Sequence, residues 1–128
     1  MYTLNTTVRK LEILLGGAVT TNELDVVTHY SDRRMDEKDN ALAADVSVTA
    51  GATPVTIVAA PLSGVNRVVE AISVYNNDTV EATLTIRYTD DATSFILMKI
   101  DLATGEQLYY EDQAGWSVLT DEGHLRSA

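Results

Sequence analysis

Histidine and serine are the residue types from which a catalytic set could be built in this chain. His29 and His124 lie far apart in the sequence, and neither has a second histidine at the spacing of a metal site. A Ser-His-Asp set assembles in space, but no serine lies in the Gly-x-Ser-x-Gly pattern of a nucleophile elbow. No glycine-rich phosphate loop is present either. We therefore predict a chain that is not an enzyme and has no catalytic or cofactor-binding residues.

Acidic residues gather where turns are expected, at Asp90-Asp91, Asp112 and Asp121-Glu122. Paired carboxylates can transfer protons or bind calcium, but aspartate is also a favoured turn residue. The chain has no Asp-x-Asp-x-Asp loop with its glycine and distal glutamate, and it has no cysteine for a zinc site. We interpret these carboxylates as solvated turn residues and predict no metal site.

Three aromatic residues near the C-terminus, Tyr109, Tyr110 and Trp116, could form a binding platform on the surface. Aromatic rings on a β-sandwich can stack on sugar rings or anchor a protein interface. Trp116 alternates with Val118, which favours a position in the core. A carbohydrate-binding module with this platform remains an alternative function.

Short strands separated by turns account for most of the chain. In segment 81–89 every even position is apolar and every odd position is polar, which is typical of a strand with one buried face. Further strands are expected at 44–49, 54–60, 67–75, 95–100, 106–111 and 116–119. Turn signals about every 8–12 residues, without helical periodicity, predict an all-β fold. We expect an antiparallel β-sandwich, jelly-roll-like, over residues 44–128.

Two turns flank the alternating segment. Asn76-Asn77-Asp78 precedes it, and Asp90-Asp91 closes its far end. Asn and Asp tolerate the left-handed backbone of tight turns. We therefore expect a β-hairpin that joins 67–75 to 81–89, followed by a second turn into 95–100.

Residues 1–43 are expected to form a separate N-terminal arm or strand pair with a charged loop. Segments 8–15 and 24–30 could pair as a hairpin, and the charged stretch 31–40 is expected to be a linker or long loop. The apolar residues of the arm either join the core or bind a neighbouring subunit. As partner-binding residues we predict Leu11, Ile13, Leu14, Leu15, Leu24, Val26 and Val27.

The charge balance narrows the classes of partner. The formal net charge is -10, from 9 Lys and Arg against 19 Asp and Glu. Such a chain repels nucleic acid and anionic lipid unless a basic patch opposes the average, and no such patch is visible. No stretch is long enough to span a membrane. The acidity favours a partner with a basic surface.

Three phrases of the sequence, at 11–22, at 65–78, and at 105–110 followed by 115–118, resemble small virion proteins of tailed bacteriophages. The resemblance spans most of the chain and consists of strand-and-turn phrases, with segment 31–40 matching least. It implies a β-sandwich or jelly-roll domain that serves as a capsid decoration or cement protein, a head fibre or a tail component. No catalytic residues come with it.

We therefore expect a virion structural protein, made in the host cytoplasm and placed on the capsid surface. It would self-associate as a dimer or trimer and bind the major capsid protein at subunit junctions, so that a subunit with affinity only for the assembled shell stabilises that shell. The alternative in the same particle is a tail or fibre adaptor that binds tail proteins. No nucleic acid, membrane or cofactor is expected.

Overall fold

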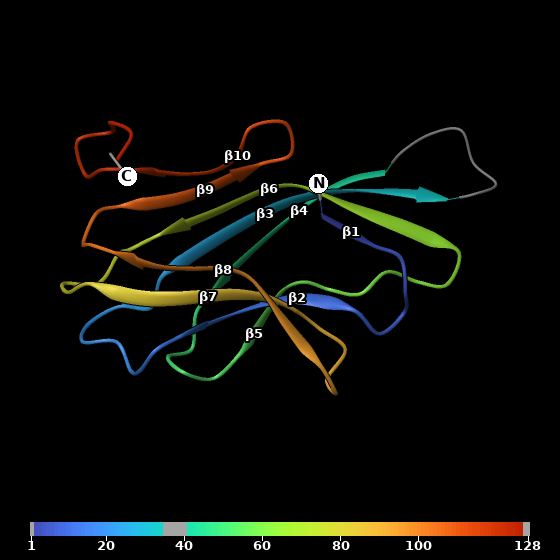
Figure 1. The fold of residues 1–128 in the computed structure, drawn as a ribbon, viewed down its shortest axis with the longest axis horizontal. Helices are drawn as coiled ribbons and strands as arrows, with labels where there is room; N and C mark the ends of the chain where they lie inside the picture. Colours follow the sequence, from blue (N-terminus) through green and yellow to red (C-terminus); the bar gives the residue numbers. More distant parts are fainter. Residues whose placement is uncertain (1, 35–40, 127–128) are drawn as a thin grey trace.

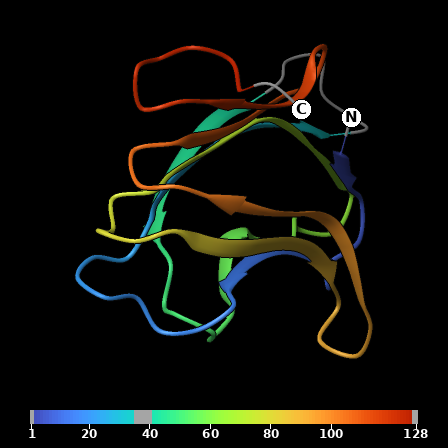
Figure 2. The same cartoon turned by 60° about the vertical axis from the view of Figure 1, so that its left-hand side comes forward.

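The computed structural model describes residues 2–34 and 41–126, which form two antiparallel β-sheets and, within those residues, no helix. Figures 1 and 2 show the two sheets as separate layers. The first sheet contains β1 (Tyr2–Leu4), β3 (Asp25–Arg34), β4 (Ala41–Val48), β6 (Val65–Tyr75), β9 (Gln107–Glu111) and β10 (Gly115–Leu119). The second contains β2 (Lys10–Leu15), β5 (Val55–Val58), β7 (Ala82–Thr89) and β8 (Ser94–Leu102). The prediction of an all-β sandwich is confirmed.

The strand order is β10-β9-β6-β3-β4 in the first sheet and β5-β2-β7-β8 in the second. One edge of β6 pairs with β3, and its other edge is shared by two strands. There, β1 pairs with residues 67–69 and β9 pairs with residues 71–75. β1 is only three residues long and has no counterpart among the predicted strands.

The predicted N-terminal hairpin is wrong. β2 pairs with β5 and β7, whereas β3 lies in the other sheet between β6 and β4. Both strands are interior strands, so residues 2–34 are part of the sandwich rather than an arm outside it. Part of the predicted charged loop, residues 31–34, belongs to β3; the remainder, 35–40, lies outside the described residues.

The two predicted turns have different outcomes. Residues 76–78 join β6 to β7, which lie in different sheets, so the predicted hairpin at this turn is wrong. Asp90 and Asp91 do join two paired strands, β7 and β8. The Asp90 carboxylate accepts the backbone N–H groups of Ala92 and Thr93, which closes this hairpin.

A single apolar core fills the space between the sheets. Alternate side chains of β2 and β7, such as Ile13 and Ile86, point inward and are fully buried. They meet the inward side chains of the first sheet, among them Val26 and Ile72. Full burial of side chains of this size contributes about 1.5–3 kcal/mol each, so the core stabilises the sandwich without disulfides.

Candidate interaction surface

The predicted partner-binding residues lie mostly inside the molecule. Five of them are buried in the core cluster: Leu11, Ile13, Leu15, Leu24 and Val26. They cannot contact a partner in the folded chain, so this prediction is wrong for them. The physical reason is that β2 and β3 are interior strands, whose inward-facing positions are covered by the opposite sheet.

Leu14 and Val27 are the two predicted residues that point away from the core, and both are half-buried. Val27 lies on the outer face of the first sheet. Cross-strand pairing places it in a row of five residues that runs across this face: Val46, Val27, Ser73, Tyr109 and Ser117. This row contains no charged side chain, although the chain as a whole carries a net charge of -10.

β4 carries the most exposed apolar side chains of this outer face. Leu42, Val46 and Val48 are 76%, 79% and 52% exposed. With Ala44 they occupy alternate positions of one strand and therefore share one face. Contiguous exposed apolar side chains of this size are typical of interaction sites, whereas isolated ones are common on any surface. We define these four residues of β4 as the β4 stripe.

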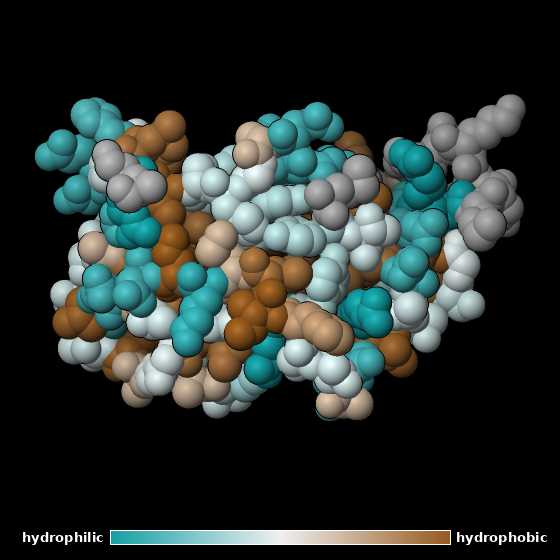
Figure 3. Space-filling model, in the orientation of Figure 1, coloured by the Kyte–Doolittle hydropathy of each residue, from teal (hydrophilic) through white to brown (hydrophobic). Residues whose placement is uncertain are grey.

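A second exposed apolar pair lies on the other sheet. Phe95 and Ile96 of β8 are neighbours in sequence, and more than half of each side chain is exposed. Figure 3 shows apolar surface gathered near the middle of the face on which β8 lies in Figure 1. Charged Lys99 and Asp101 interrupt β8 further along, so the apolar segment of this strand is shorter than the β4 stripe.

The three predicted surface aromatics do not form one platform. Tyr110 is only 3% exposed, and Trp116, which pairs with it, points inward with it. Their ring centroids are 5.0 Å apart, and Tyr2 packs on Tyr110 at 4.8 Å. Tyr109 faces the opposite side of the sheet. Trp116 is half-buried and packs against the core cluster.

A polar network fastens the loop between β2 and β3. The Asp78 carboxylate accepts backbone N–H groups from Thr20, Thr21 and Asn22 at 2.8–3.2 Å, and a fourth from Thr79. These bonds favour the charged form and lower the pKa of Asp78 to about 2. Because the carboxylate is already saturated with donors, its role here is structural.

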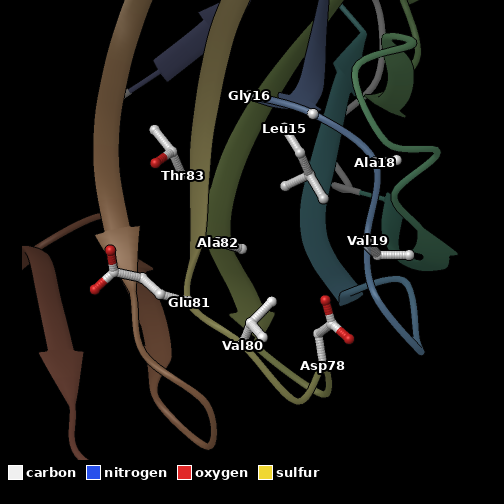
Figure 4. A pocket seen from close by; sticks show the side chains of 10 residues that line it. Leu15, Gly16, Ala18, Val19, Asp78, Val80, Glu81, Ala82 and Thr83 are labelled. Atoms are coloured by element: carbon white, nitrogen blue, oxygen red, sulfur yellow. The ribbon is translucent and has the colours of Figure 1, made fainter.

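A cavity of about 290 Å³ lies beside this network, between the loop at 15–19 and the start of β7 at 80–83. Figure 4 shows the lining side chains, with Asp78 near one end and Glu81 toward the other. Apart from these two, the lining consists of Thr83, glycine and small apolar residues. The cavity therefore offers one available charged group, Glu81, and no basic or metal-binding set.

The residues singled out for chemistry are dispersed. His29 lies exposed on the outer face of β3, and His124 lies exposed in the terminal turn after β10. Within residues 2–34 and 41–126, no three His, Cys, Asp or Glu side chains are grouped so that they could hold a metal ion. The same part of the chain contains no helix that could span a membrane.

An inward-facing ion pair closes the end of the sandwich that lies beside β4. The Arg67 guanidinium donates to both oxygens of Asp32 at 2.7 and 2.9 Å and to the carbonyl of Ala59 at 2.8 Å. It also lies 4.3 Å from the ring centroid of Tyr30. The hydrogen bond to Asp32 is the main cause that raises the pKa of Arg67, and the nearby Asp45 carboxylate of β4 adds to it. Arg67 is therefore held between β3 and β6 by its ion pair with Asp32 and its contact with Tyr30.

No protein-family model matches this chain, and no curated protein or solved structure matches it.

Proposed function

We propose that this chain is a non-enzymatic structural protein of a tailed-phage particle, a decoration protein that binds the assembled shell. The observation that carries this proposal is the β4 stripe, a line of exposed apolar side chains at the margin of the outer face of the first sheet, together with the uncharged row that begins at Val46. Binding of a partner over such a surface is favourable, because apolar area is removed from water. The resemblance of three sequence phrases to small virion proteins supplies the kind of particle.

The rigidity of the domain supports a role in assembly. The segment expected to be a partner-binding arm is built into the sandwich, and the loop that follows β2 is fastened by Asp78. A preformed surface binds without the entropy loss of ordering a segment. A subunit of this kind stabilises a shell by mass action, since it has a binding site only on the assembled form.

Charge favours a basic partner. The net charge of -10 attracts a positively charged surface that lies within the screening length of the salt solution. This attraction speeds the first encounter more than it tightens the final complex. The exposed apolar side chains of the β4 stripe then supply close contact. We therefore expect shell binding to slow, but not disappear, as the salt concentration rises.

Location in the particle tests the proposal. Cryo-EM maps would be compared for particles assembled with and without this chain, at a resolution that shows strands. We expect additional density over the junctions between capsid subunits, with the outer face of the first sheet toward the shell or toward a second copy. Density at the tail would replace this proposal with the adaptor function. Identical maps would reject both functions.

A further inference from the structure

β4 is the last strand of the first sheet, so one of its edges has no partner strand among the described residues. The direction of its free backbone groups follows from one hydrogen bond. The N–H of Thr49, directly after β4, donates to the carbonyl of Leu24 at 3.0 Å, so residue 49 points its backbone groups toward β3. In an antiparallel pair this direction alternates, and the β3–β4 register is regular throughout. The N–H and C=O groups of Leu42, Ala44, Val46 and Val48 therefore point outward.

The other edge strands of the described sandwich carry protection that β4 lacks. β5 has only four residues, and β8 carries Lys99 and pairs with β7 through a bulge. The edge of β10 is covered by the terminal segment, where Leu125 bridges to Leu119 and the Arg126 N–H donates to Val118. Short length, lysine, bulges and covering segments are the devices that prevent strands from pairing between molecules.

β4 itself has eight residues, a regular register, no proline, no lysine and one charged side chain, Asp45. Seven of the eight residues of β4 are exposed. We infer that a second copy of this chain pairs with this edge, antiparallel, about a two-fold axis at Ala44. This pairing specifies which strands two copies would use to associate in the proposed function. It rests on the proposed function only for the role of the dimer in a particle.

Symmetry and charge fix the register of the pairing. A two-fold axis perpendicular to the sheet keeps the outer face outward, so even positions pair with even positions and one residue pairs with itself. An axis at Asp45 would place two like charges directly opposite each other, which is destabilising. An axis at Ala44 instead places Asp45 opposite Ala43 of the copy and pairs residues 41–47, the longest overlap of β4 residues without that clash.

This register joins the apolar side chains as well as the backbone. Leu42 of one copy lies opposite Val46 of the other, and the same pair recurs on the far side of Ala44. Six outer-face side chains then form one continuous apolar cluster, and the two first sheets become one sheet. Each outward-pointing N–H and C=O group between residues 42 and 46 gains a partner, as the strand geometry requires.

Self-complementarity and charge indicate that the molecule that pairs with the β4 edge is a second copy of this chain. Two chains that each carry a net charge of -10 repel one another, so they associate best where little of that charge lies, and β4 has a single carboxylate, Asp45. Seven paired residues bury less than the roughly 1,200–2,000 Å² of a stable interface. The dimer is therefore expected to form reversibly with concentration and to be reinforced when both copies bind one assembly.

Cysteine cross-linking tests both the interface and its register, because the natural chain has no cysteine. In this pairing the Cα atoms of the two Ala44 residues are about 5.5 Å apart, within the range of a disulfide. The two Leu42 residues are offset by four residues, about 13 Å, along the strand direction alone, which is too far for a disulfide. Ala44→Cys is therefore expected to form a disulfide-linked dimer at least about tenfold faster than Leu42→Cys under mild oxidation.

Leu62→Cys is the matched control, since Leu62 is 71% exposed and lies on a loop outside the first sheet. We expect it to cross-link as slowly as Leu42→Cys. Equal rates for all three variants would overturn the interface. A faster Leu42→Cys would overturn the register at Ala44.

Sedimentation velocity over a concentration series provides a second readout without oxidation. Leu42→Lys places a lysine on the β4 edge and is expected to weaken the dimer at least about tenfold, whereas Leu62→Lys leaves it unchanged. A wild type that stays monomeric at every concentration, or a dimer that Leu42→Lys leaves intact, would overturn the inference. Neither result would bear on shell binding, which the cryo-EM comparison measures separately.

Discussion

The indole Nε1–H of Trp116 donates a hydrogen bond of 2.8 Å to the hydroxyl of Tyr2, which joins residues 114 positions apart in the chain. β1 pairs with β6, and β10 pairs with β9 on the same side of β6. The bond therefore ties the two ends of the chain together at one side of the sandwich. Tyr110 packs against both rings and Tyr88 meets Tyr2 edge-on at 5.9 Å, so four aromatic rings share this site.

Trp116→Phe removes this hydrogen bond while it keeps an aromatic ring in the cluster. We expect the free energy of unfolding to fall by about 1–3 kcal/mol, from the lost bond and the smaller ring. Tyr109→Phe, on the opposite face of the same hairpin, should change it by less than about 0.5 kcal/mol. Urea denaturation of both variants measures the difference. Equal effects would mean that the Tyr2 contact adds nothing to stability.

Asp78 makes the stability of the fold dependent on pH. Its pKa is about 2 in the folded chain against an ordinary value of 3.8, because four backbone N–H groups stabilise the carboxylate. A lowered folded-state pKa contributes stability above the unfolded-state value, and this stability is lost as the pH falls through the folded-state value. The urea midpoint should therefore decline between about pH 4 and about pH 2.

Asp78→Asn isolates that contribution, since backbone hydrogen bonds from Thr93 and Ala92 also lower the pKa of Asp90. The neutral amide has one acceptor oxygen in place of two charged ones, so the variant should be less stable at pH 7 and lose less stability on acidification. The two urea midpoints should converge near pH 2. Parallel curves for the variant and the wild type would show that another group causes the acid sensitivity.

Local patterns predict strands in this chain better than they predict strand neighbours. The alternation at 81–89 specifies β7 almost to its ends. Asn76-Asn77-Asp78 specifies a turn, but nothing local says whether the chain then stays in its sheet or crosses to the other. The Asn76 amide donates to the carbonyls of Val80 and Leu102, and Leu102 is distant in sequence, so the crossing depends on contacts that a short window does not contain.

The position of the interaction surface is hard to predict from the sequence for a related reason. Alternating apolar residues such as Leu11, Ile13 and Leu15 give the same pattern in a core strand and in an interface strand. The β4 stripe is hard to predict because segment 41–48 is rich in alanine and has weak strand propensity. The strand predicted from the sequence, 44–49, covers only the second half of β4. Pairing with β3, rather than local propensity, makes this segment a strand.

Ile13→Ala distinguishes a core role for β2 from a partner-binding role. Ile13 is fully buried between its neighbours Val55 and Ile86. Truncation of a buried isoleucine to alanine lowers the free energy of unfolding by about 2–5 kcal/mol, because transfer energy is lost and a cavity remains. Leu14→Ala, at the adjacent outward position, should have a smaller effect. Unfolding midpoints measured for the isolated protein separate the two roles, since a partner-binding residue would leave them unchanged.

Gly105 is expected to be the glycine least tolerant of substitution in the described chain. Its backbone has a φ of +81°, and a Cβ atom there would lie 2.8 Å from the Cβ of Asp121. Gly64 has nearly the same φ, +80°, but open space around it, so Gly64→Ala reports the backbone strain alone, about 1–2 kcal/mol. Gly105→Ala should destabilise the fold by more than that, because Asp121 must also move.

Asp121 begins the segment that folds back over the edge of β10. The Arg126 amide in this segment donates to Val118, so its hydrogen exchange should also speed up in Gly105→Ala. If the two alanine variants have equal unfolding midpoints and equal exchange at Arg126, the close approach of Asp121 does not constrain this turn.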